Sequence, residues 1–291
     1  MTIGGQAVIE GVMMKSPRWV STSVRKTSGE IVSKVEAYQS LSSRSKLLRL
    51  PIVRGAVNLF EQLFLGIKSL TYSAEVVSSD DETVRGTSNW KFSLSAGLTV
   101  VVAFALGLLL FFYLPLVIAN HVGAKGSIVF NLVDGLVRLG FFFAYLGMLS
   151  FWKEMRRVFE YHGAEHKSIH AYEHGETLDV ESVKKYTTRH ARCGTSFLLV
   201  VMVVSIVVFI FMGRPESVGE RLLRLCAVPL IAGISYEIIR LAGKKHDGLL
   251  VKIISAPGLA LQRFTTREPS DDQLEVALDA LKNALKAEVG V

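Results

Sequence analysis

Residues 152–195 read WKEMRRVFEYHGAEHKSIHAYEHGETLDVESVKKYTTRHARCGT and contain five of the seven histidines of the 291-residue chain. Four of them, His162, His166, His170 and His174, follow one another at intervals of four residues, and the fifth is His190. On a helix, this interval places side chains along one slowly drifting stripe. We therefore expect a helix that presents a row of imidazoles, with the rest of the chain anchoring and covering it.

The centre of this stretch fits the H-x-x-E-H pattern, in which two histidines one turn apart hold zinc and a glutamate polarises a water molecule. We expect His162 and His166 to be the metal ligands and Glu165 to be the catalytic base. Gly163 disfavours a helix by about 1 kcal/mol relative to alanine, so another backbone segment is expected to approach it closely. A catalytic zinc needs a third protein ligand. The candidates are His170, Glu173, Glu176, His190, Cys193, Glu237 and Asp247.

A simpler alternative assigns no metal to these histidines. In that case they form a polar helix at a membrane surface and pair with Glu160, Glu165, Glu173 and Glu176. This alternative does not by itself explain why five histidines lie within residues 162–190. If a cofactor is bound, we expect a divalent metal, with zinc the first choice for imidazole ligands.

The composition predicts an integral membrane protein, since the chain is 50% hydrophobic and has a mean hydropathy of +0.37. About 20 apolar residues are needed to cross a bilayer. Residues 92–120 and 195–213 contain no Asp, Glu, Lys or Arg and are expected to span it. Residues 128–152 and 222–242 are also long enough, but they carry charges and are expected to pack inside a bundle.

The charges inside these two spans are spaced for pairing along a helix. Asp134 and Arg138 lie four residues apart, and we expect them to neutralise each other; the alternative is that they line a polar cavity. Glu237 and Arg240 lie three apart and are expected to pair in the same way. Glu237 is also at the membrane level of the histidine-rich stretch, which makes it a candidate ligand.

Basic residues near span ends mark the cytoplasmic side. Residues 1–91 contain twelve Lys or Arg, residues 153–192 contain eight and residues 243–291 contain seven, whereas the two remaining connections contain only Lys125, Arg214 and Arg221. We therefore expect four spans with both termini and the histidine-rich stretch in the cytoplasm. The net charge of +7 suits anionic lipid headgroups. Nucleic acid is not an expected partner, because basic and aromatic residues are not interleaved.

The remaining segments complete a mainly α membrane protein with a small cytoplasmic β-hairpin or sheet. Residues 1–49 are expected to be β-rich, with a hairpin at 18–38 around Thr27, Ser28 and Gly29. Residues 50–77 predict an amphipathic helix in the membrane interface, and residues 78–91 a linker. In the tail, 243–291, Ser270 and Gln273 form a capping box. The helix that follows should carry an apolar stripe that docks on this protein or on a partner, formed by Leu274, Leu278, Leu281 and Leu285.

Five separated motifs, in order along nearly the whole chain, resemble the YqhQ-like family of bacterial membrane proteins, a family of unknown function. The motifs are GGQAVIEGVMM, RGAVNLFEQLFLGIKSL, FEYHGAEHKSIHAYE, RHARCGTSF and QRFTTREP. The resemblance implies a multi-pass protein of the bacterial inner membrane. Members are sometimes labelled predicted metal-dependent enzymes, which points to His162, Glu165 and His166.

Two functions from different classes follow. The first is a membrane-bound, metal-dependent hydrolase that acts at the cytoplasmic surface on a peptide or a lipid-linked group. The second is a non-enzymatic scaffold that docks a partner, such as the translocation or translation machinery, through its basic cytoplasmic surface and C-terminal helix. Metal content, and the effect of replacing Glu165, separate the two.

Overall fold

A computed structural model describes residues 3–79, 89–123, 125–190, 193–244 and 249–290. The strands are β1 (Gly4–Val8), β2 (Gly11–Lys15), β3 (Trp19–Arg25) and β4 (Ile31–Ala37). The helices are η1 (Leu41–Ser43), η2 (Leu47–Arg49), α1 (Val53–Ser79), α2 (Asn89–Leu108), η3 (Leu109–Tyr113), α3 (Leu114–His121), α4 (Ser127–Phe151), α5 (Lys153–Glu173), α6 (Val180–Lys184), α7 (Gly194–Met212), α8 (Val218–Cys226), α9 (Val228–Lys244), α10 (Leu249–Thr265) and α11 (Asp271–Val289).

The N-terminal residues form a four-stranded antiparallel sheet in the order β1-β2-β3-β4. The hairpin expected at residues 18–38 is confirmed as β3 and β4, and Gly29 takes the positive φ of 90° that its turn requires. A second hairpin, β1 and β2, was not predicted. Alternate residues of β2 face opposite sides of the sheet, so Met14 and Met13 belong to two different clusters of buried side chains.

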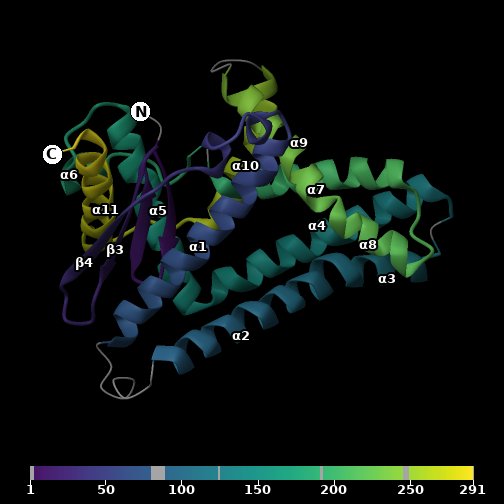
Figure 1. The fold of residues 1–291 in the computed structure, drawn as a ribbon, viewed down its shortest axis with the longest axis horizontal. Helices are drawn as coiled ribbons and strands as arrows, with labels where there is room; N and C mark the ends of the chain where they lie inside the picture. Colours follow the sequence, from purple (N-terminus) through teal and green to yellow (C-terminus); the bar gives the residue numbers. More distant parts are fainter. Residues whose placement is uncertain (1–2, 80–88, 124, 191–192, 245–248, 291) are drawn as a thin grey trace.

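Helices cover both faces of this sheet (Figure 1). On one face, α11 and α5 share a core with β2, which includes Val12, Tyr161 and Leu278. On the other face, α1 places Leu65 and Tyr72 against the sheet. The capping box of Ser270 and Gln273 is present at the start of α11. The apolar stripe of α11 thus docks within this chain.

Helix α1 exposes an apolar stripe and buries small or polar residues. Phe60 and Phe64 are 58% and 70% exposed, whereas Glu61 is buried and accepts a hydrogen bond of 2.8 Å from the Tyr38 hydroxyl. Near its start, Gly55 packs closely against Gly233 of α9. The helix therefore joins the sheet to the helical bundle and turns its apolar side outward.

Four helical segments are long and apolar enough to span a membrane: Gly97–His121, Ser127–Phe151, Gly194–Met212 and Val218–Leu241. All four predicted spans are thereby confirmed. The first consists of α2, η3 and α3, and η3 is a π-helical turn just before Pro115. Because proline has no N–H to donate, the regular α-helical hydrogen bonding changes at this point.

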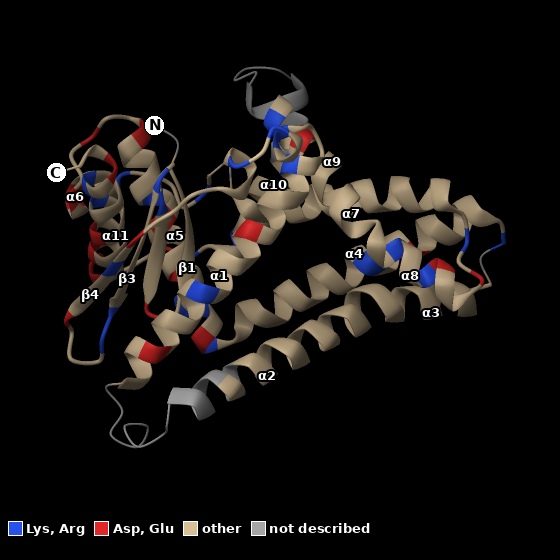
Figure 2. Cartoon of the chain, viewed as in Figure 1, with Lys and Arg blue, Asp and Glu red and all other residues tan. Residues whose placement is uncertain are grey.

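Asp134, Arg138 and Arg224 form a buried charged cluster inside the bundle, where Figure 2 shows basic residues in the region of α4 and α8. Arg138 donates to Asp134 over 2.9 Å, as the spacing predicted. Arg224 joins them, with its Nη1 3.9 Å from the Asp134 carboxylate, and also donates to Asn131 over 2.6 Å. The Asp134 carboxylate offsets one of the two guanidinium charges, so the cluster keeps a net charge of +1 inside the bundle.

Figure 1 shows the bundle extending to the right of the sheet, whereas α6 and α11 lie at the left, on the side of the sheet away from the bundle, with α5 beside the strands. The N-terminal strands, the connection between the second and third spans, and the C-terminal helix thus assemble on one side. This assembly brings segments far apart in sequence to the histidines of α5.

Candidate metal centre

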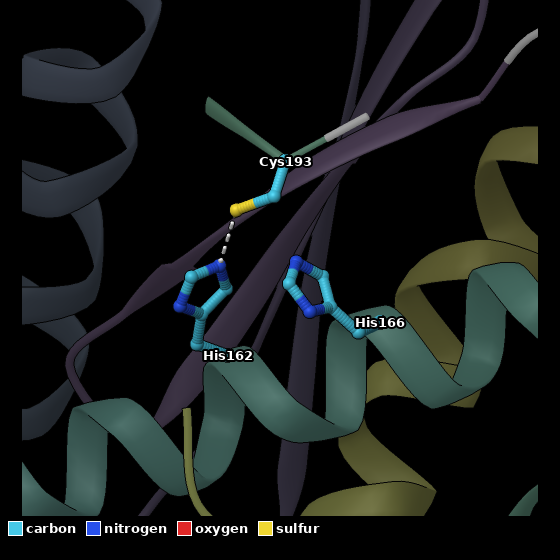
Figure 3. A group of neighbouring side chains, drawn as sticks. All are labelled: His162, His166 and Cys193. Carbon is cyan, nitrogen blue, oxygen red and sulfur yellow. Dashed lines mark hydrogen bonds between the residues drawn. The ribbon is translucent and has the colours of Figure 1, made fainter. Parts of the chain in front are cut away.

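The centre is built on α5, which begins directly after α4 and continues to Glu173. Its middle is almost entirely buried, from Gly163 to Ile169, although the residues include Glu165, His166 and Lys167. Polar side chains are buried at this density only where they have partners or a ligand. Figure 3 shows the resulting group of His162, His166 and Cys193.

The His162 ring is fixed by the last residue of α10. Its Nδ1 lies 2.7 Å from the Thr265 carbonyl oxygen. A carbonyl oxygen only accepts hydrogen bonds, so the ring carries its proton on Nδ1 and presents a lone pair on Nε2. This backbone partner is typical of metal-binding histidines, whose second nitrogen is held in place by an acceptor.

The His166 ring is held in the same way by the segment before α7. Its Nδ1 donates to the Thr188 carbonyl oxygen over 2.6 Å. Its Nε2 is buried and has no hydrogen-bond partner among the residues that the structure describes. Burial, with a further contribution from His162, lowers the pKa of His166 to about 2, so the ring is neutral at physiological pH. A neutral imidazole with an unsatisfied nitrogen can serve as a metal ligand.

Cys193 completes the group from the N-cap position of α7. Its Sγ lies 3.3 Å from His162 Nε2, and ligand atoms of Cys193, His162 and His166 all lie within 4.8 Å of one another. In tetrahedral zinc sites, a Zn–N bond of about 2.0 Å and a Zn–S bond of about 2.3 Å place the nitrogen and sulfur atoms roughly 3.5 Å apart. Burial raises the pKa of the Cys193 thiol, whereas hydrogen bonds from Thr195 lower it.

Glu165 lies beside the three ligand atoms without a cation of its own among the described residues. One carboxylate oxygen is 3.8 Å from His162 Nε2 and 4.0 Å from His166 Nε2. Burial raises the pKa of Glu165 to about 7, although His162 opposes this. The backbone N–H of Gly5 in β1 also donates to this carboxylate. The sheet therefore supports the carboxylate from the side opposite to α5.

Replacing Gly5 by alanine should destabilise the fold and displace Glu165. A Cβ at this position would lie 2.7 Å from Glu165 Cγ and 2.9 Å from the Met13 carbonyl oxygen. Overpacking of this kind costs about 1–3 kcal/mol. Unfolding of the full chain in detergent measures the cost. Gly4→Ala is the matched control, because no described atom lies within 4 Å of its Cβ; equal stability of the two variants would contradict the close contact.

Three contacts hold α5 against the segment that follows α10. Gly163 is covered by the Arg267 carbonyl oxygen, which occupies the space of a side chain. The Arg267 N–H donates to the Phe159 carbonyl over 2.9 Å. Lys167 is 2% exposed and forms an ion pair with Glu268. The close backbone approach predicted at Gly163 is confirmed, and it positions the Thr265 carbonyl that orients His162.

Gln262 of α10 holds the backbone of the loop that leads to Cys193. Its side-chain oxygen accepts from the His190 N–H over 2.8 Å, and its side-chain nitrogen donates to the His190 carbonyl over 2.9 Å. Gln262 is fully buried, and His190 is 7% exposed. This two-point contact fixes the position from which both His190 and Cys193 reach α5.

Gln262→Ala should therefore lower the free energy of unfolding. The substitution leaves a buried N–H and a buried carbonyl of His190 without partners, at a cost of about 1–3 kcal/mol each. Asn283→Ala removes one hydrogen bond, of 2.9 Å to Asp279, from a partly buried site on α11 and serves as the control. Thermal unfolding in detergent compares them. If Gln262→Ala were no less stable than Asn283→Ala, the two-point contact between Gln262 and the His190 backbone would have no structural role.

The other candidate ligands are separated from this group. His170, Glu173 and His190 form a second cluster one turn further along α5. Glu176 is exposed and accepts from the Tyr186 hydroxyl over 3.4 Å. Glu237 pairs with Arg240 over 3.8 Å, as the spacing predicted. As a candidate ligand it was wrongly predicted: Nε and Nη2 of Arg54 donate to its carboxylate, and it belongs to neither group of potential ligands among the described residues. Asp247 lies outside the described residues.

The sequence alone did not reveal the residues that orient the ligands. Thr188 and Thr265 act through their main-chain carbonyls, so their residue types do not indicate this role. Gln262 and Gly5 lay in motifs that were noted for their resemblance but had no assigned chemistry. Of these residues, only Gly5 gave a sequence signal of its role, because a glycine inside a strand often marks the close approach of another group.

Comparison with known proteins gives one family. The family described as "Protein of unknown function (DUF1385)" matches residues 50–287. The chain is 31% identical over 298 residues to "Uncharacterized protein YqhQ" of Bacillus subtilis (strain 168), and the alignment covers 98% of this chain and 92% of that protein. No solved structure matches the chain. Both the metal-ligand group and the segments that orient it lie within the shared region.

Proposed function

We propose that this chain, which belongs to the DUF1385 family of proteins of unknown function, is a membrane-bound, metal-dependent hydrolase. His162, His166 and Cys193 would hold a zinc ion, and Glu165 would act as the general base. The family membership confirms the resemblance in the five motifs. The hydrolytic activity is our inference from the geometry of the centre.

One observation carries the proposal: the buried Nε2 of His166 has no hydrogen-bond partner among the described residues and lies in a group with His162 and Cys193. An unsatisfied buried polar atom costs about 1–3 kcal/mol. A divalent cation satisfies His166 Nε2, His162 Nε2 and the Cys193 thiolate together. Three nitrogen and sulfur ligands with one remaining open position match the general pattern of catalytic zinc sites.

The residues around the open position suit hydrolysis. When bound, zinc supplies a Lewis acid beside that position. Glu165 is within reach of a water molecule there and can accept its proton as the water oxygen attacks a carbonyl or ester carbon. The same carboxylic acid then donates the proton to the leaving nitrogen or oxygen. A new C–O bond replaces the broken bond, and no oxidant or reductant is required.

The setting favours a substrate at the membrane surface. Cys193 caps α7, so the metal ligands lie at the start of a membrane span. The apolar stripe of α1, with Phe60 and Phe64 exposed, suits insertion into the interface of the same bilayer. Lys and Arg are more numerous in residues 1–91, 153–192 and 243–291, with twelve, eight and seven, than in the other two connections, which contain Lys125, Arg214 and Arg221. We therefore propose a cytoplasmic site in a bacterial inner membrane, acting on a peptide or a lipid-linked group.

Glu165→Gln tests catalysis separately from metal binding. The amide keeps the size of the side chain but cannot accept a proton from water, so bound metal should be retained while turnover is lost. Cells that carry this variant should accumulate an uncleaved peptide or lipid species, detected by comparing their membranes with those of wild-type cells by mass spectrometry. Glu176→Gln is the control, since Glu176 is exposed and outside the centre.

A silent Glu165→Gln variant with full metal content would favour a scaffold in which the ion has a structural role. The scaffold would then need a docking surface other than the apolar face of α11. Leu274, Leu278 and Leu281 on that face are buried inside this chain.

A further inference from the structure

The histidine row of α5 contains a second group that the proposed active centre does not use. His170 and Glu173 lie on the last turns of α5, and His190 comes from the loop held by Gln262. One ligand atom from each of the three lies within 4.8 Å of the other two. Two imidazoles and a carboxylate are a donor set that binds divalent transition metals.

Contacts with the backbone and with Glu173 position the two rings. His170 Nε2 is 2.9 Å from the Arg189 carbonyl oxygen, so it carries the proton and Nδ1 carries the lone pair. His190 Nε2 is 3.3 Å from a Glu173 carboxylate oxygen. An ion shared by the three side chains would be held by one nitrogen from each imidazole and one carboxylate oxygen.

The second group adjoins the first along the stripe that the sequence predicted. The His166 ring centroid is 4.4 Å from that of His162 and 5.7 Å from that of His190, and the His190 centroid is 4.6 Å from that of His170. The second group is also more accessible, because the Glu173 side chain is 26% exposed. Solvent can therefore complete its coordination.

The geometry assigns to His170, Glu173 and His190 a second divalent-metal site, filled by zinc or a similar ion. This site does not depend on hydrolysis at the first centre. It differs chemically from the first centre because it offers only nitrogen and oxygen ligands, whereas the first offers the Cys193 sulfur. That difference allows each ion to be followed separately.

The test is a Co²⁺ titration of the full chain in detergent after removal of bound metal. A sulfur-to-cobalt charge-transfer band reports the Cys193 centre, and elemental analysis after desalting gives the total number of ions. We expect two ions per chain in the wild type. Glu173→Gln and His170→Ala should each bind one ion and keep the charge-transfer band, which also shows that these variants fold.

His174→Ala is the control, because His174 is the next histidine of the row and belongs to neither group. It should keep two ions. A single ion in the wild type that is lost with Cys193→Ser, or two ions in both His170→Ala and Glu173→Gln, would overturn the second site. A wild type without the band that loses its ion in His170→Ala would support the second site and refute the first centre.

Discussion

Replacing Cys193 by serine should abolish the sulfur-to-cobalt charge-transfer band of the protein and empty the His162 and His166 centre of metal. The thiolate is the one soft, anionic ligand of the three, and it faces His162 Nε2 over 3.3 Å. A serine hydroxyl is shorter and does not ionise at neutral pH, so it cannot replace the charge that the thiolate provides. Co²⁺ titration of the purified full chain, followed by absorption spectroscopy, measures the loss.

Cys226→Ser is the matched control for this experiment. Cys226 is the other free cysteine of the chain, is exposed and ends α8 at a distance from the histidines. It should leave the band unchanged. Loss of the band with Cys226→Ser, or its persistence with Cys193→Ser, would show that the sulfur ligand has been misassigned.

Gly163→Ala should have the largest effect on the assembly of the centre. The added Cβ would occupy the position of the Arg267 carbonyl oxygen, which belongs to backbone and cannot rotate away. The segment after α10 must then separate from α5, and the Thr265 carbonyl that orients His162 moves with it. We expect a loss of about 1–3 kcal/mol in stability. Metal affinity should fall by about 10- to 100-fold, as when an orienting partner is removed.

Thermal unfolding in detergent and competition with a metal chelator measure these two effects. Gly140→Ala makes the same substitution inside helix α4, where no described atom lies within 4 Å of the added Cβ. Alanine favours a helix by about 1 kcal/mol over glycine, so this control should be as stable as the wild type or more stable. A Gly163→Ala protein that behaved like Gly140→Ala would show that the two backbones are further apart than described.

Local signals predicted the elements of the fold well. The four spans followed from uninterrupted apolar length, the β3 and β4 hairpin from the turn around Gly29, and the start of α11 from the Ser270 capping box. Each of these depends on residues close together in sequence. The β1 and β2 hairpin gave a weaker signal. Its turn places Glu10 at a φ of 52°, a backbone conformation that a glutamate does not predict.

The centre was only partly predictable, because it depends on distances between separate segments. The interval of four residues indicated His162 and His166 as neighbours. It could not select Cys193 from seven candidate ligands, since only the packing of α7 and α10 decides which segment reaches α5. Similarly, the membrane level of Glu237 made it a candidate ligand, whereas Arg54, which is 183 positions away, holds its carboxylate. Long-range partners of this kind have no local signature.

Zinc X-ray absorption spectroscopy of the purified wild-type chain tests most directly whether His162, His166 and Cys193 share one ion. The predicted spectrum contains a sulfur ligand at about 2.3 Å and imidazole nitrogens at about 2.0–2.1 Å, and the sulfur contribution disappears in Cys193→Ser. A protein that retains no zinc, or whose zinc has only nitrogen and oxygen neighbours, would contradict the centre described above.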